Sequence, residues 1–149
     1  MIAISVQTHD FDVAEVLKKM RASRKDIGAI VSFVGLVRDL NLNETVSTLT
    51  LEHYPGMTEK ALTNIAETAK NRWDIMDVSV IHRVGTLAPS DQIVLVVVSS
   101  AHRGEAFQAC EFVMDYLKTE APFWKKETTP EGERWVDAKA SDDQARDRW

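Results

Sequence analysis

The sequence predicts an α+β fold with a mixed β-sheet, in a single domain that spans residues 1–149. Apolar residues recur along the chain with either the two-residue period of strands or the 3.6-residue period of helices. Residues 93–98 are apolar on both faces, which is typical of a strand in the middle of a sheet. No glycine-rich phosphate loop precedes a helix, and 149 residues suffice for one domain with its own core.

The first elements follow from local periodicity. Residues 2–6 alternate between apolar and small side chains, which predicts a half-buried strand. Asp10 or Asp12 can cap a short helix whose apolar residues have helical spacing. Residues 28–37 are rich in β-branched side chains and predict a buried strand that leads into Arg38.

The middle of the chain predicts a loop, a strand and a helix. Residues 39–44 contain two asparagines and have no periodicity, so we expect a mobile loop. Residues 46–52 alternate again as a strand, and Pro55 and Gly56 form a turn into a helix. The predicted apolar face of this helix consists of Met57, Ala61, Leu62, Ile65 and Ala69.

The last third of the chain predicts two more strands, at residues 78–84 and 93–99, and a third helix at about residues 104–118. Pro122 ends this helix, and a short extended piece, a polar turn and a charged tail follow. The tail ends in Trp149. A disordered end is the default for such a residue, but a terminal aromatic is better explained if it docks on another surface, with a second subunit as one candidate. The predicted buried stripe of the helix is Ala106, Cys110, Val113, Met114 and Leu117.

Composition limits the function classes. The net charge of −5 argues against a general nucleic-acid binder, and no apolar stretch is long enough to cross a bilayer. A single cysteine, Cys110, fits a reducing compartment, and the N-terminal residues do not have the pattern of a signal peptide. We therefore expect a cytoplasmic protein that binds neither nucleic acid nor a membrane.

The most informative segment surrounds Pro122. Lys118 lies in the last turn of the predicted helix, and Lys125 and Lys126 follow the aromatic pair at 123–124. This pattern indicates cations at the rim of an apolar cleft, which suits an anionic ligand that contains a ring. Each lysine has an ordinary alternative explanation, as a helix-end charge or an edge-strand charge.

Two further basic groups follow predicted strands. His102 and Arg103 lie between the most apolar strand and the third helix, where strand ends and a helix N-terminus favour an anion. A capping turn with a solvated arginine is an equally good interpretation of these two residues alone. Arg38 can bind a phosphate through two hydrogen bonds, although a single arginine at this place is more often a surface residue.

Other chemistries have little support. Cys110 lies in the predicted buried stripe, which favours a core residue over a nucleophile. The four histidines, His9, His53, His82 and His102, do not have the spacing of a metal site.

Six ordered motifs carry a resemblance over almost the whole chain. The chain closely resembles the family of large, catalytic subunits of molybdopterin synthase, the MoaE family. The motifs are Phe-Val-Gly-Leu-Val-Arg at 33–38, Leu-Glu-His-Tyr-Pro-Gly-Met at 51–57, Ser-Ala-His-Arg at 100–103, Met-Asp-Tyr-Leu-Lys at 114–118, Ala-Pro-Phe-Trp-Lys-Lys-Glu at 121–127 and Glu-Gly-Glu-Arg-Trp-Val at 131–136.

The resemblance implies an α/β hammerhead-type core with a mixed or antiparallel sheet, plus a small antiparallel subdomain. It also implies a homodimer within a heterotetramer. The partner is a small ubiquitin-like sulfur-carrier subunit whose Gly-Gly tail ends in a thiocarboxylate. Its sulfur is transferred in two rounds to cyclic pyranopterin monophosphate, which forms the dithiolene of molybdopterin. The large subunit brings no metal and no organic cofactor.

The resemblance also assigns roles to residues of this chain. Lys118 is the main catalytic lysine, and Lys125 assists catalysis. Leu36 stands where some relatives have a basic residue, so it is expected to offer only a backbone contact. Lys139 stands where relatives can carry an arginine that reaches the neighbouring protomer's pocket. The full substrate-binding set is Leu36, Val37, Arg38, His102, Arg103, Lys118, Lys125, Lys126, Glu127 and Lys139.

Two other functions are compatible with such a pocket. A catalytically inert module could dock a ubiquitin-like tail or an anionic metabolite, but it should have lost the ammonium group at 118 or 125. A purely structural dimeric domain leaves the basic cluster without an explanation. The sequence therefore favours the sulfurtransferase.

Overall fold

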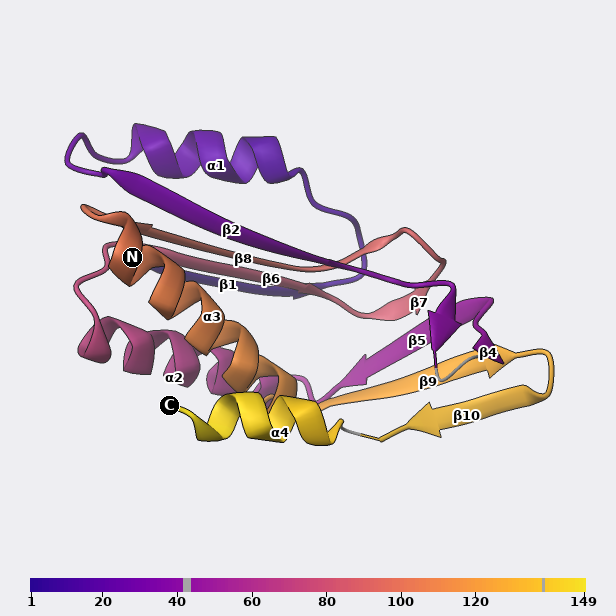
Figure 1. Ribbon diagram of the computed structural model, residues 1–149. Helices are drawn as coiled ribbons and strands as arrows, with labels where there is room; N and C mark the ends of the chain where they lie inside the picture. Colours follow the sequence, from indigo (N-terminus) through magenta and orange to yellow (C-terminus); the bar gives the residue numbers. More distant parts are fainter. Residues whose placement is uncertain (42–43, 138) are drawn as a thin grey trace.

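A mixed four-stranded sheet forms one half of the molecule (Figure 1). In this computed structural model, which describes residues 1–41, 44–137 and 139–149, its strand order is β1-β6-β8-β2. Strands β1 and β6 are parallel, and the other neighbours are antiparallel. Strand β8 is internal and buried from Val94 onwards, which confirms the prediction for residues 93–98. The strands are β1 (Ile2–Gln7), β2 (Ala29–Leu36), β6 (Val78–Arg83) and β8 (Gln92–Ser100).

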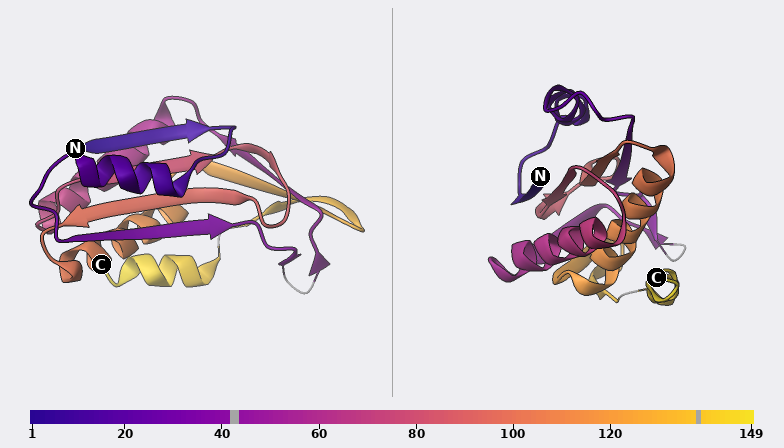
Figure 2. Two further views of the ribbon diagram at one scale, coloured as in Figure 1. Left: turned by 90° about the horizontal axis from the view of Figure 1, so that it is seen from above. Right: turned by 90° about the vertical axis from the view of Figure 1, so that its left-hand side faces the viewer.

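Helices cover both faces of this sheet (Figures 1 and 2). Helices α2 (Met57–Arg72) and α3 (Arg103–Glu120) pack on one face, and α1 (Val13–Ala22) lies on the other. Of the two predicted caps, Asp12 begins α1, because its carboxylate accepts the Glu15 N–H at 3.1 Å. The predicted stripe of α3 is buried, which confirms that prediction.

The prediction for α2 was wrong at Met57, whose side chain is 53% exposed. The buried face of the helix begins one residue later, at Thr58.

A second, fully antiparallel sheet corresponds to the expected small subdomain. Its strand order is β10-β9-β5-β7, and its strands are β5 (Thr48–His53), β7 (Gly85–Leu87), β9 (Phe123–Thr129) and β10 (Gly132–Val136). The predicted loop at 39–44 contains two very short strands, β3 (Leu40–Asn41) and β4 (Glu44–Thr45). Residues 42 and 43 of that loop lie outside the described residues.

The charged tail contains a helix, α4 (Ala140–Asp147), which packs along α3 (Figure 1). Trp149 docks on its own chain, with its ring edge-on to Trp73 and Phe112 at centroid distances of 5.4 and 5.8 Å. Its indole N–H donates to the Asp115 carboxylate at 2.6 Å. Among the described residues, no helix has the length and apolar character needed to span a membrane.

Candidate active site

The predicted basic residues gather where the two sheets meet. A cavity of about 130 Å³ opens at the end of β2, beside the C-terminal end of α3 and the inner face of β9. Seven of the predicted site residues line it: Leu36, Val37, Arg38, Lys118, Lys125, Glu127 and Lys139. Leu40, Asn41, Val46, Leu49, Ile93 and Val136 complete the lining, so the cations face apolar walls.

Backbone contacts place the first of these cations. Val37 is buried, its N–H donates to the Asp91 carbonyl at 2.9 Å, and its carbonyl accepts the Ser90 N–H at 2.8 Å. These two bonds fix the end of β2 against the turn that precedes β8. Arg38 therefore emerges at the mouth of the cavity, with its side chain exposed.

The alternation of β9 decides which lysine enters the cavity. Phe123, Lys125 and Glu127 lie on the inner face of the strand, because side chains two residues apart share a face. The β-ladder fixes this register through the pairing of Lys125 with Leu51 on β5 and with Val136 on β10.

Lys125 is the most perturbed cation of the site. Burial, the positive charge of Lys118 and a hydrogen bond between the two lysines together lower its pKa to about 8, and burial is the largest cause. Asp142 opposes this shift, and Lys139 adds to it. The two predicted catalytic lysines are thus direct neighbours, one exposed at the end of α3 and one half-buried on β9.

Glu127 is buried, and protein groups satisfy its carboxylate. Arg134 donates to Oε2 from Nε and Nη2 at 3.2 and 3.0 Å, and Asn41 donates to Oε1 from Nδ2 at 2.6 Å. This network neutralises the acid, so its charge does not cancel the cations of the cavity. Within the described residues, Arg38, Lys118 and Lys139 form no salt bridge, which leaves the site with a net positive charge.

Lys126 lies on the opposite face of β9, outside the cavity. Its Nζ lies 5.5 Å from the centre of the Trp135 ring and 3.5 Å from the Glu133 carboxylate. Trp124 and Trp135 are 48% and 56% exposed on this side of the chain.

His102 and Arg103 are not brought to the cavity within one chain. His102 is the N-cap of α3, Arg103 is its first residue, and both side chains are exposed. Lys118 lies near the other end of the same helix (Figure 1). At 1.5 Å per residue, about 22 Å of helix separates Arg103 from Lys118.

Two adjoining cavities contain residues that sequence reasoning missed. One, of about 100 Å³, is lined by His82, Phe33, Phe123 and Leu117 together with Lys118 and Lys125. The other, of about 170 Å³, adds Asp137 and Asp142. His82 could have been identified from the sequence, because a histidine at an apolar position of a predicted strand is unusual. Asp142 could not, because the sequence of α4 is polar and gives no such signal.

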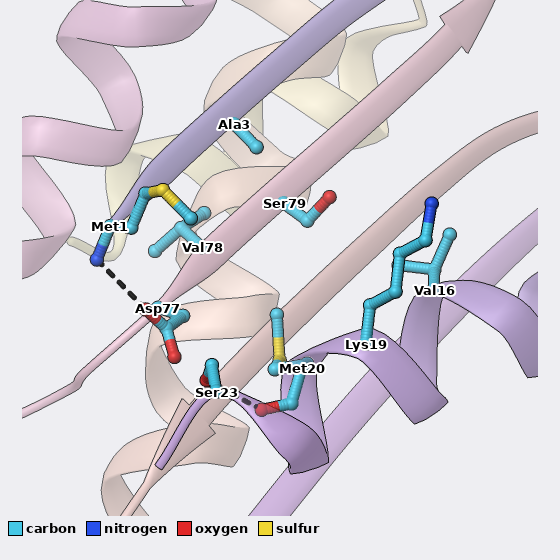
Figure 3. Close-up of a pocket in the computed structure, with 9 residues that line it drawn as sticks. All are labelled: Met1, Ala3, Val16, Lys19, Met20, Ser23, Asp77, Val78 and Ser79. Carbon is cyan, nitrogen blue, oxygen red and sulfur yellow. Dashed lines mark hydrogen bonds and ion pairs between the residues drawn. The ribbon is translucent and has the colours of Figure 1, made fainter.

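A larger apolar pocket of about 250 Å³ lies away from these cations, between α1 and strands β1 and β6 (Figure 3). The N-terminal ammonium of Met1 is paired there with the Asp77 carboxylate at 2.8 Å, and Lys19 is the other charged group. Its lining does not combine cations with a perturbed acid or base, so the lysine cavity is the better candidate site. Among the described residues, no three His, Cys, Asp or Glu side chains are placed to hold a metal ion.

Comparisons with known proteins agree on one family. The family described as MoaE protein matches residues 6–120. The molybdopterin synthase catalytic subunit of Ralstonia nicotianae is 61% identical over 149 residues, which are 100% of this chain and 85% of that protein. The structure of the molybdopterin biosynthesis MoaE protein from Burkholderia ambifaria has a TM-score of 0.86 and 59% identity, and covers 100% of this chain and 98% of its own.

A more distant structure shares the fold. It is a protein–protein complex of subunits 1 and 2 of the molybdopterin-converting factor from Helicobacter pylori, with a TM-score of 0.71 and 22% identity. The match covers 91% of this chain and 90% of that one.

Proposed function

The chain belongs to the MoaE family, and from this premise we propose that it is the catalytic subunit of a molybdopterin synthase. As a single domain over residues 1–149, it transfers sulfur from the C-terminal thiocarboxylate of a small ubiquitin-like subunit to cyclic pyranopterin monophosphate. The observation that carries this proposal is the set of cations, Arg38, Lys118, Lys125 and Lys139, around one apolar-walled cavity in a chain of net charge −5. We place its activity in the cytoplasm.

The substrate explains both halves of the lining. Its phosphate needs cations, and Arg38 and Lys139 stand at the mouth of the cavity with no salt bridge to a described residue. Its rings need apolar walls, which Leu36, Val37 and Ile93 supply.

The lysine pair suits the transfer itself. Each round forms a carbon–sulfur bond at the pterin side chain, from which an oxygen substituent leaves, and breaks the carbon–sulfur bond of the tail, where an oxygen from water replaces sulfur. Negative charge then develops on oxygen and sulfur, and an ammonium group at Lys118 stabilises it. Lys125, half-buried and with its pKa lowered by burial, can exchange a proton near neutral pH. Glu127, held by Arg134 and Asn41, orders the wall beside them.

The test is a sulfur-transfer assay with purified wild-type protein and the variant Lys118→Ala. Thiocarboxylated small subunit and pyranopterin precursor are added, and the dithiolene product is followed by mass. We expect the variant to lose roughly 10²-fold or more in turnover while it still binds the small subunit. Lys60→Ala is the matched control, because Lys60 is an exposed lysine of α2 outside these cavities. Near-normal transfer by Lys118→Ala would refute the assignment, and no transfer by the wild-type complex would favour an inert docking module.

A further inference from the structure

His82 occupies a position on β6 at which an apolar side chain would be expected. Val78, Val80 and His82 alternate with partly exposed residues, and all three are buried. The two valines belong to the core under α2 and α3, whereas His82, at the end of the strand, lines the small cavity with Lys118 and Lys125. Burying an imidazole ring on such a face costs free energy, because its polar groups lose their contact with water. Burial also lowers the pKa of His82 to about 3, so the ring is neutral.

Two contacts hold the ring in one orientation. Its Nδ1 lies 2.8 Å from the Arg83 carbonyl oxygen, so the neutral ring carries its proton on Nδ1 and donates it there. Its face stacks on Phe123, with a centroid distance of 3.8 Å and an interplanar angle of 18°. The ring therefore joins the end of β6, in the first sheet, to the start of β9, in the second.

Phe123 connects this contact to the chemistry. It precedes Lys125 by two residues on the same face of β9, and both line the cavity that His82 lines. The stacked pair therefore forms part of the wall of the cavity beside the Lys125 side chain, and it limits how much water can surround that group. Because burial is the main cause of the lowered pKa of Lys125, this packing has a direct effect on that group.

We propose that His82 is a positioning residue of the sulfur-transfer site: its neutral ring, stacked on Phe123, walls the cavity of Lys125 and limits the solvation of that lysine without adding a third positive charge. The role in transfer rests on the proposed function, but the effect on Lys125 does not. The other charged groups around Lys125 are Lys118 on α3, Asp142 on α4, Asp137 and Lys139 after β10, Arg38 after β2 and the neutralised Glu127 on β9. None of them would be changed by a substitution at His82.

The experiment measures the pKa of Lys125 directly in the full chain. Acetic anhydride labels only neutral amines, and mass spectrometry resolves the labelling of each lysine as a function of pH. In His82→Ala the cavity becomes larger and admits more water, and we expect the labelling midpoint of Lys125 to rise by about one unit or more towards the ordinary lysine value. In His82→Phe the stacked ring is kept, and the midpoint should stay near that of the wild type.

Val80→Ala is the matched structural control. Val80 lies two residues away on the same buried face of β6 but does not line the cavity, so its loss should destabilise the core without moving the midpoint. An unshifted Lys125 in folded His82→Ala, or an equal shift in Val80→Ala, would overturn the proposal. A shift specific to His82→Ala would support it even if the wild-type protein transferred no sulfur, in which case only the proposed function would fall.

Discussion

Lys118 and Lys125 line the same cavity from different surroundings. Lys118 is exposed at the end of a helix, whereas Lys125 is half-buried on an inner strand face, and burial and its neighbour lower its pKa to about 8. Because the folded-state pKa is below the usual lysine value, the ammonium form predominates below pH 8 and the neutral amine above it. Lys125 is therefore suited to take up a proton during the reaction.

This difference predicts a pH dependence of transfer. The rate should rise with pH through about 8 and then level off, because the neutral form of Lys125 accumulates over that range. In Lys125→Arg the charge is kept but the side chain stays protonated, so the rise should disappear along with most of the activity. Initial rates from about pH 6.5 to about pH 9.5 check this prediction. If the transfer rate of the arginine variant rose with pH at the same midpoint, the titrating group would be one other than Lys125.

At the scale of elements, the start of α2 braces the segment that carries the lysines. Thr58 is fully buried, and its hydroxyl accepts the Tyr54 N–H at 3.0 Å and donates to the Pro122 carbonyl at 3.0 Å. Pro122 immediately precedes β9. One hydroxyl therefore joins the turn before α2 to the short connection between α3 and the strand that carries Lys125.

Thr58→Val should lower the free energy of unfolding by about 1–3 kcal/mol, because it leaves two part-buried backbone groups without their partner. Thr68→Val is the control from the same helix. Thr68 is exposed, its hydroxyl bonds the Asn64 carbonyl four residues back, and its loss should change stability by no more than about 0.5 kcal/mol. Urea denaturation of both variants measures the difference, and equal effects would show that the bridge to Pro122 adds nothing.

Helix α4 depends on contacts with α3 and on its terminal aromatic residue. Arg146 pairs with Glu120 at 2.8 Å, Arg148 pairs with Glu111 and Asp115, and Trp149 packs against Trp73 and Phe112. Exposed ion pairs contribute little, so the aromatic contacts should dominate.

Trp149→Ala should therefore cost about 2 kcal/mol or more of unfolding free energy, whereas Trp135→Ala should cost less than about 1 kcal/mol, because Trp135 is 56% exposed. Thermal or urea denaturation of the two single variants distinguishes the residues. Similar costs would mean that the Trp149 ring does not hold α4 in place in solution.

Periodicity predicted the elements that bury one apolar face and failed where other forces decide. The strands at 2–6 and 93–98 and the buried stripe of α3 were foreseen, because burial against one sheet imposes their pattern. The segment at 28–37 does form a strand, β2, but the prediction that it is buried was wrong, because β2 lies at the edge of the sheet and none of its residues is buried. Strand β7 is only three residues long, and α4 has no buried residue, so neither has an apolar period to detect. Met57 was predicted to be buried, but Thr58 takes the buried position at the start of α2. A threonine can be buried there because two hydrogen bonds satisfy its hydroxyl.

The three-dimensional arrangement of strands and helices explains why the site could be predicted only in part. Arg38, Lys118, Lys125 and Lys139 converge because the ends of β2, α3 and β10 meet beside β9, and the resemblance named all four. The face of β9 that carries Lys126 follows from strand register, which motifs do not encode. Nor does a motif show that His102 and Arg103 lie a helix length away from the lysines.

If His102 and Arg103 bind substrate, they must serve the cavity of another copy, which accords with the homodimer that the family resemblance implies. This arrangement can be tested by complementation between Arg103→Ala and Lys118→Ala.

Each homodimer should be impaired, because each of its two sites lacks one group. In a mixed dimer, one site combines the intact Lys118 of one chain with the intact Arg103 of the other, and the second site lacks both. Random pairing should then restore roughly a quarter of the wild-type activity, since half of the dimers are mixed and each has one complete site of two. Sulfur transfer by protein co-expressed from the two variants measures this. If Arg103 acts within its own chain, mixing will give no more than the average of the two parents, because no site then becomes complete.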